Sequence, residues 1–212
     1  AGCRSTCDHG SNRGSYPRNR RVGGTKTVQE QRIKQAVAEI LAAIGEDPDR
    51  EGLQDTPARV ARMYESLFSG VGINTDDAID AVFEAESHDP VIVSGLVFYS
   101  VCEHHLLPFY GEARLGYVPN GKIAGISKLA RALEVASHRP QVQERLTAEV
   151  VDSIFNVLQP DGVVVELEAE HLCMAMRGVK KPGTRVLTSA VRGEFKNYPL
   201  GQEGLLALMH SR

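Results

Sequence analysis

The sequence is poor in cysteine, in long apolar runs and in charge of one sign. Its 212 residues include only 4 cysteines, which is too few for a disulfide scaffold and suits a reducing cytoplasm. No apolar run approaches the roughly 20 residues of a membrane span, and the basic N-terminus lacks the apolar core of a secretory signal. A net charge of −3 argues against a general nucleic-acid binder.

The composition divides the chain into three regions. Residues 1–26 are rich in Gly, Ser, Arg and Asn and predict a disordered basic tail, because they hold too few apolar side chains to repay the entropy of ordering. Residues 27–89 predict a helical region, and residues 90–212, where the pattern changes to strands, predict a second domain. The tail also contains Cys3, Cys7 and His9, whose spacing would permit metal binding, but the flanking Gly and Ser favour disorder and we leave it unassigned.

The spacing of apolar residues predicts an α+β fold. Residues 27–46 place apolar side chains on one helical face, and a second helix begins at Asp55-Thr56-Pro57, with proline at the first helical position. Further along, strands are predicted over 90–101, 112–118, 162–173 and 184–195, and helices over 127–137 and 140–158. This order indicates an antiparallel four-stranded sheet backed by two helices, preceded by a helical N-terminal region.

The most informative motif is Cys102-Glu103-His104-His105, which lies between a predicted strand and a proline. Cys102 and His105 are close enough in sequence for one turn to direct both side chains at one metal ion. A thiolate together with an imidazole favours zinc. Two ligands do not hold zinc, so the chain must supply a third.

The alternation of side chains in the strand 162–173 supplies a candidate. His171 and Cys173 share the apolar face of that strand, whereas Glu166, Glu168 and Glu170 share the other. Cys173 would complete a site with two cysteines and one histidine, and water would fill the fourth position. Three alternatives stay open: Cys173 as a small buried hydrophobe, His171 as a satisfied core residue, and Cys102 with Cys173 as a redox pair.

Basic residues form a second group of candidates. Ser127, Lys128 and Arg131 open a predicted helix, where Ser127 can act as the N-cap and the two cations lie one turn apart. The positive end of a helix dipole together with cations is suited to an anion such as a polyphosphate. Three further arginines could join this group: Arg59, Arg62 and Arg177. The alternative is a solvated charged face, which for Arg59 and Arg62 taken alone is the better interpretation.

A carboxylate opens the predicted helix 140–158. Gln143, Glu144 and Arg145 lie in its first turn, where the helix dipole favours a negative charge. Simple stabilisation of the helix explains Glu144. The functional alternative is a carboxylate that accepts hydrogen bonds from the paired N–H groups of a base edge such as that of guanine.

Several of these motifs together resemble the GTP cyclohydrolase I family. The resemblance lies in Cys-Glu-His-His at 102–105, Gly-Ile-Ser-Lys-Leu-Ala-Arg at 125–131, Arg-Pro-Gln-Val-Gln-Glu-Arg-Leu at 139–146 and His-Leu-Cys-Met-Ala-Met-Arg-Gly at 171–178. It covers about residues 27–195 in order, and the stretch after Phe195 drifts from the family pattern. The resemblance implies that residues 90–212 form a catalytic domain with the T-fold (tunnelling fold), and that the protein is a homodecamer with sites at subunit interfaces.

The resemblance also implies a role for each matched residue. Cys102, His105 and Cys173 match the ligands of one zinc ion per chain, and His104 and His171 match catalytic histidines. The remaining matches are on the side of the substrate GTP: Glu144 with Gln143 at the guanine, and Ser127, Lys128, Arg131, Arg177, Arg59 and Arg62 at the triphosphate, with Arg59 supplied by a neighbouring subunit. The implied reaction opens the guanine ring at C8, releases formate and forms 7,8-dihydroneopterin triphosphate, the first step of folate and tetrahydropterin biosynthesis. It involves neither nucleic acid nor membrane.

Two other functions were weighed against this one. A zinc nucleobase deaminase would carry H/C-x-E followed by P-C-x-x-C, but Glu103 directly follows Cys102 and no P-C-x-x-C occurs. A non-catalytic T-fold protein would bind GTP without turnover, yet mere binding does not require both His104 and His171.

Overall fold

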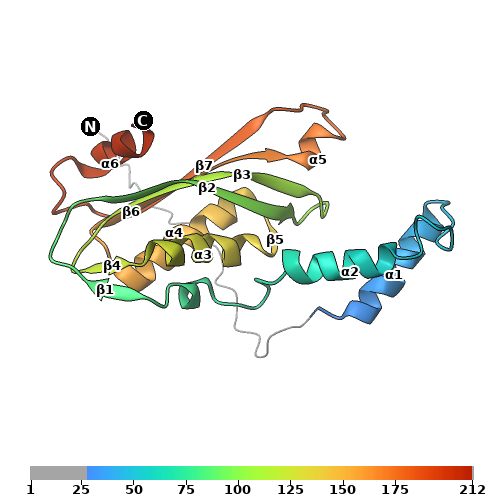
Figure 1. Ribbon diagram of the computed structural model, residues 1–212. Coiled ribbons are helices and arrows are strands. Elements are labelled where there is room, and N and C mark those ends of the chain that lie inside the picture. Colours follow the sequence, from blue (N-terminus) through green and yellow to red (C-terminus); the bar gives the residue numbers. More distant parts are fainter. Residues whose placement is uncertain (1–27, 212) are drawn as a thin grey trace, which may run out of the picture.

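The computed structural model describes residues 28–211, so the predicted tail with Cys3, Cys7 and His9 lies outside the described residues. A twisted sheet forms the body, two long helices lie along one of its faces, and a pair of helices extends from one end (Figure 1). No helix within residues 28–211 is both long and apolar enough to cross a bilayer.

After two α-helices and a 3-10 helix, four strands follow in succession, and helices then alternate with strands up to the last helix. The helices are α1 (Glu30–Ala43), α2 (Thr56–Leu67), the 3-10 helix η1 (Thr75–Ala78), α3 (Ile126–Ser137), α4 (Gln143–Leu158), α5 (Leu172–Ala175) and α6 (Gly201–His210). The strands are β1 (Val82–Glu84), β2 (Val91–Cys102), β3 (Pro108–Val118), β4 (Lys122–Ala124), β5 (Pro140–Gln141), β6 (Gly162–His171) and β7 (Arg185–Gly193).

The main sheet has the strand order β5-β2-β3-β6-β7. Its four long strands pair antiparallel, whereas the two-residue β5 pairs parallel with the end of β2. The predicted fold class is therefore confirmed: the fold is α+β, with four long antiparallel strands backed by two helices, the T-fold arrangement. A separate two-stranded sheet, β1 with β4, was not predicted.

The two faces of the sheet bury different partners. Alternate residues of β3 and β6, such as Leu115, Tyr117 and Leu167, are buried together with Leu129 of α3 and Ile154 of α4 in the larger core cluster. The opposite face carries a smaller cluster, formed by Val118, Val164, Phe195, Leu205 and Met209, which seats α6. Because side chains alternate along a strand, one sheet supports both clusters.

Two local predictions are wrong, and one helix was not predicted. The strand predicted over 162–173 ends at His171, and Cys173 lies in the single turn α5 instead of on the strand. Ser127 is not the N-cap of α3, because Gly125 occupies that position and Ser127 lies inside the first turn. The stretch after Phe195, which contains α6, was not assigned any element.

The helical pair α1–α2 buries little of its surface within the chain. The two helices pack mainly against each other, and α1 contains no buried residue. Ile40 and Ile44, both on the predicted apolar face, are 59% and 69% exposed. The spacing of apolar residues therefore predicts α1 correctly. Part of the apolar face of α1, however, packs against nothing else in the described part of the chain. The proposed division between a helical region and a catalytic domain at residue 89 stays a prediction.

Candidate metal centre and active site

The topology of the sheet gathers the candidate ligands at one end. Cys102 ends β2, the connection 103–107 leads into β3, and β6, which pairs with β3, ends at His171 beside the start of β3. The end of one strand, the start of its antiparallel neighbour and the end of the next strand must meet at the same edge. Because β5 pairs with Cys102, the start of α4 lies at this edge as well.

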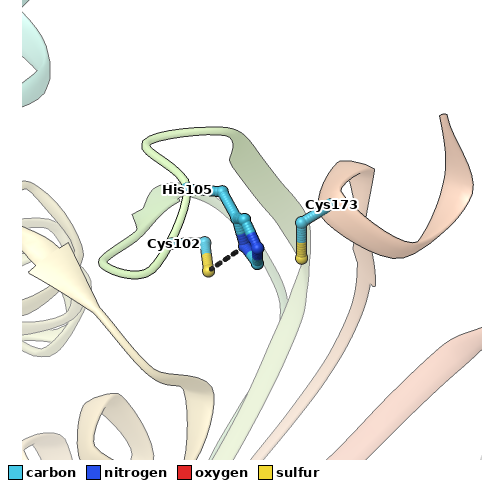
Figure 2. A group of neighbouring side chains, drawn as sticks. All are labelled: Cys102, His105 and Cys173. Carbon is cyan, nitrogen blue, oxygen red and sulfur yellow. Dashed lines mark hydrogen bonds between the residues drawn. The ribbon is translucent and has the colours of Figure 1, made fainter. Parts of the chain in front are cut away.

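Three side chains form a group that could hold a metal ion. The donor atoms of Cys102, His105 and Cys173 all lie within 4.8 Å of one another, and Cys102 Sγ is 3.9 Å from His105 Nδ1. Figure 2 shows Cys102 at the end of β2 and His105 from the connection between β2 and β3, facing Cys173 from α5. These separations suit one zinc ion, whose bonds to sulfur and nitrogen measure about 2.3 and 2.0 Å. The donor set of two thiols and one imidazole therefore fits a metal centre.

The connection between β2 and β3 is shaped by its own backbone. The N–H of Cys102 donates to the carbonyl of Leu107 at 2.9 Å, and the N–H of Leu106 donates to the carbonyl of Cys102 at 2.9 Å. Leu106 adopts a left-handed conformation with φ of 52°, which is unfavourable for a branched residue. This tight turn directs the side chains of Cys102 and His105 to the same side.

Burial changes the acid–base properties of the centre. Partial burial, together with the neighbouring Cys102 thiol, raises the pKa of Cys173. The unliganded thiol is thus favoured over the thiolate, and a metal ion that binds there must displace a proton. Cys102 is itself buried, whereas His105 is exposed.

His171 is held from two sides next to the metal ligands. Its ring stacks on Phe109 with centroids 4.6 Å apart and planes 2° apart, and its Nε2 lies 2.8 Å from Gln143 Oε1. Burial lowers the pKa of His171, although the charge of nearby Glu144 opposes this shift. A neutral imidazole is therefore favoured near neutral pH.

Three other predicted residues lie at the same end. His104 is exposed, and its Nδ1 is 3.8 Å from Cys102 Sγ. Glu144 is exposed in the first turn of α4, and Arg177 is exposed in the segment that follows α5. Histidine, carboxylate and guanidinium groups thus surround the metal ligands.

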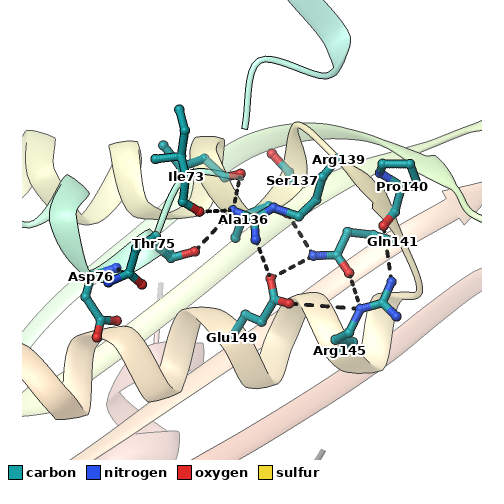
Figure 3. A network of polar contacts seen from close by, with 12 residues as sticks. Ile73, Thr75, Asp76, Ala136, Ser137, Arg139, Pro140, Gln141, Arg145 and Glu149 are labelled. Atoms are coloured by element: carbon teal, nitrogen blue, oxygen red, sulfur yellow. Dashed lines mark hydrogen bonds and ion pairs between the residues drawn. The ribbon is translucent and has the colours of Figure 1, made fainter. Parts of the chain in front are cut away.

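A polar network supports this end from behind. Gln141 donates to the carbonyl of Ala136 and to Glu149, both at 2.9 Å, and accepts from Arg145 Nε at 2.8 Å (Figure 3). Arg145 also donates to the carboxylate of Glu103, which lowers the pKa of Glu103. The residue beside Cys102 is therefore tied to the start of α4.

The same network reaches the segment between α2 and the body. Arg139 donates to the carbonyl of Ile73 at 3.1 Å and pairs with Glu149 at 3.5 Å (Figure 3). This contact connects the residues that follow the projecting helices to the network behind the metal ligands.

The predicted phosphate-binding residues of α3 are not at the metal end. Ser100 donates to the carbonyl of Ser137 at 2.7 Å, so it is the last turn of α3 that lies near the end of β2. Ser127 is about 15 Å further along the helix axis, at a rise of about 1.5 Å per residue. Ser127 and Arg131 instead line a hollow of about 390 Å³ beside β2, and Lys128 pairs with Asp80.

Arg59 and Arg62 lie on α2, on the projecting helical pair. Both are exposed, and Arg59 pairs with Asp55 of its own helix at 3.2 Å. Within one chain, these arginines and the α3 residues do not join the metal ligands.

Sequence reasoning missed several residues that shape the site. Phe109 lies opposite His171 in the β3–β6 register and supports its ring, and Glu103 and Arg145 fix the connection that carries two ligands. The predicted strand 112–118 left Phe109 out, because β3 begins earlier, at Pro108. The pairing of Phe109 with His171 depends on the register between two strands that are far apart in the chain.

Comparison with known proteins agrees with this geometry. The model of the family GTP cyclohydrolase I matches residues 33–210, so the match extends beyond Phe195, where the sequence pattern was judged to drift. GTP cyclohydrolase 1 of Thermobifida fusca is 53% identical over 184 residues, covering 83% of this chain and 89% of the relative. GTP cyclohydrolase 1 of Dehalococcoides mccartyi is 51% identical over 185 residues, covering 86% and 98%.

A solved structure, the archaeosine synthase QueF-Like in the apo form, is 18% identical with a TM-score of 0.40, covering 52% of this chain and 97% of that chain. The family model and the relatives, by contrast, span most of the chain and agree on one name. The chain therefore belongs to the GTP cyclohydrolase I family.

Proposed function

We propose that this protein is a zinc-dependent GTP cyclohydrolase I. It hydrolyses the imidazole ring of GTP at C8, releases formate and yields 7,8-dihydroneopterin triphosphate. The observation that carries the proposal is the convergence of Cys102, His105 and Cys173 within 4.8 Å, beside two further histidines, in a chain of this family. A structural zinc site normally has four protein ligands, whereas three leave a position open for chemistry.

Cys102, His105 and Cys173 would hold one zinc ion per chain. Zinc in such a site lowers the pKa of a bound water to about 7 and so makes a nucleophile available near neutrality. The buried Cys102 and the half-buried Cys173 would anchor the ion, while the exposed His105 faces the solvent side from which a substrate arrives.

His171 and His104 would transfer protons, and Glu144 would bind the guanine base. His171, neutral near pH 7, is suited to accept and return a proton, and His104 would act as an auxiliary acid–base group. Glu144, exposed at the start of α4, would accept hydrogen bonds from the N–H groups of the guanine edge. Arg177, also exposed at this end, would contact the triphosphate.

The remaining predicted substrate-binding residues would reach the substrate from other subunits. Ser127, Lys128 and Arg131 lie at the far part of α3, and Arg59 and Arg62 lie on the projecting helices. A homodecamer would bring these surfaces of one chain to the metal end of another. We expect this assembly to work in the cytoplasm, where thiol ligands stay reduced.

Incubation of the zinc-loaded protein with GTP tests the proposal. We expect formate, and a pterin that becomes fluorescent after oxidation, with one zinc per chain in the same sample. Ammonia in place of formate would indicate a deaminase, and bound GTP without turnover would indicate a binding protein. Either result would overturn the proposed function.

A further inference from the structure

We infer that Gln143 is a positioning residue, which fixes one tautomer of His171 and leaves Nδ1 as the nitrogen that exchanges protons. The inference deepens the role of His171 and rests on the proposed function for that role. It also changes the assignment of Gln143, which sequence reasoning placed at the substrate.

Gln143 is buried, with only 1% of its surface exposed, and its amide nitrogen is fully used. Nε2 donates to the carbonyl of Leu167 at 2.9 Å and to the carbonyl of Val186 at 2.8 Å, and Thr188 Oγ1 is 3.2 Å away. An amide nitrogen has two hydrogens, so two backbone carbonyls satisfy it. No donor remains for a substrate.

These carbonyls also decide which way the amide points. If the oxygen and nitrogen of Gln143 were exchanged, the oxygen would face two carbonyl oxygens at less than 3 Å, without any hydrogen between them. The oxygen Oε1 must therefore face the other way. In that direction it meets His171 Nε2 at 2.8 Å.

The orientation of the amide then fixes the histidine. An amide oxygen only accepts, so Nε2 of His171 must carry the hydrogen, and in the neutral ring Nδ1 carries the lone pair. Phe109 stacks on the same ring at 4.6 Å and prevents the ring from tilting away from this contact. Phe109 of β3 and Gln143 at the start of α4 thereby fix the ring of His171 through its face and its Nε2, and leave Nδ1 available.

A histidine that transfers protons needs this kind of support. A partner on one ring nitrogen selects the tautomer and the orientation, and the opposite nitrogen performs the proton transfer. Gln143 supplies this partner without a charge. The chemical consequence is that the proton enters and leaves at His171 Nδ1.

Solid-state NMR on the zinc-loaded, full-length protein labelled with 15N-histidine tests the inference. The spectrum of His171→Asn identifies the His171 signals among the 7 histidines. We expect the neutral ring in the wild type to be the Nε2–H tautomer. A wild-type spectrum that shows the Nδ1–H tautomer would overturn the inference without any variant.

Gln143→Met keeps the length of the side chain but removes the acceptor. We expect a mixture of tautomers and a fall in kcat of about 10- to 100-fold, the usual range for residues that orient an active group, with KM for GTP changed less than about 3-fold. Thr188→Val is the matched control, since it alters the surroundings of Gln143 without touching His171, and should leave the tautomer unchanged.

The kinetic pattern separates the alternatives. If Gln143→Met raises KM while kcat and the tautomer stay the same, Gln143 contacts the substrate and the inference is wrong. A wild-type protein that shows the Nε2–H tautomer but releases no formate from GTP would overturn the proposed function, while the fixed tautomer would still be supported.

Discussion

The metal end of the sheet and the start of α3 carry two different parts of the predicted site. At the metal end, Cys102, His105 and Cys173 converge within one chain, because neighbouring strands bring their ends together. At the start of α3, Ser127 and Arg131 line a hollow that contains none of the metal ligands. Within one chain, therefore, the candidate metal ligands meet, whereas the proposed phosphate-binding residues of α3 lie apart from them.

The two regions also differ in how they are held. The metal end is fixed by β-sheet pairing and by the network of Gln141, Arg145 and Glu103. The cations of α3 are exposed or paired with a neighbour such as Asp80, so a ligand can engage them after modest rearrangement. Rigid support suits a reacting group, whereas a polyphosphate tolerates flexible cations.

The largest effect is expected at the metal end. Cys173→Ser removes a thiolate ligand. We expect the variant to lose its zinc, because the two remaining ligands do not hold the ion, and its GTP turnover to fall below detection. Zinc content and formate release measure this, and circular dichroism shows whether the fold persists. Met176→Leu, an exposed change close by, is the control. A Cys173→Ser protein with full turnover would show that the metal centre lies elsewhere.

The start of α3 should respond differently. Lys128→Ala and Arg131→Ala each remove one charge-assisted contact to phosphate, and we expect kcat/KM to fall about 10- to 100-fold with zinc content unchanged. Steady-state kinetics with GTP measure the change.

Co-expression of two variants then tests whether the regions belong to different subunits. Chains with Cys173→Ser and chains with Lys128→Ala are each defective, but mixed oligomers would contain some sites with both intact surfaces. We expect partial recovery of turnover. Absence of recovery in verified mixed oligomers would mean that both regions act within one chain.

The network behind the ligands should have an intermediate effect. Glu103→Gln weakens the ion pair with Arg145, and we expect zinc affinity to fall about 10-fold, because groups that orient a ligand segment tune metal affinity to this extent. Competition with a chelator measures the affinity. Asp152→Asn is the control: it weakens the separate ion pair between Asp152 and Arg192 and should leave the zinc affinity unchanged.

The smallest effect within one chain is expected on the projecting helices. Ile44 is 69% exposed, so Ile44→Ser should change the stability of the isolated fold by about 0.5 kcal/mol or less. If the helical pair contacts other subunits, as we propose, sedimentation at low concentration should show smaller species with zinc content unchanged. An unchanged sedimentation profile would place the subunit interface elsewhere.

Much of the fold was accessible from the sequence. The spacing of apolar residues, together with Pro and Gly residues at the ends of elements, predicted α1, α2 and all four long strands. These signals act over only a few residues, so they can be read from the sequence. The error at Cys173 shows the limit of that approach: alternation predicted its inward direction from a strand, but the strand ends at His171 and a helical turn carries the thiol to the ligands. Short elements such as β5 depend on a distant partner and have no local signal.

The sequence by itself determined the chemical inventory of this protein: two cysteines and a histidine with metal-ligand spacing, two further histidines, a carboxylate at a helix start and a set of cations. Only the tertiary structure decided which of these meet. It placed His171 between Phe109 and Gln143, turned Gln143 away from the surface, and separated the α3 cations from the metal ligands. The physical reason is that residue type and local period are properties of short segments, whereas proximity is set by strand register and helix direction across the whole chain.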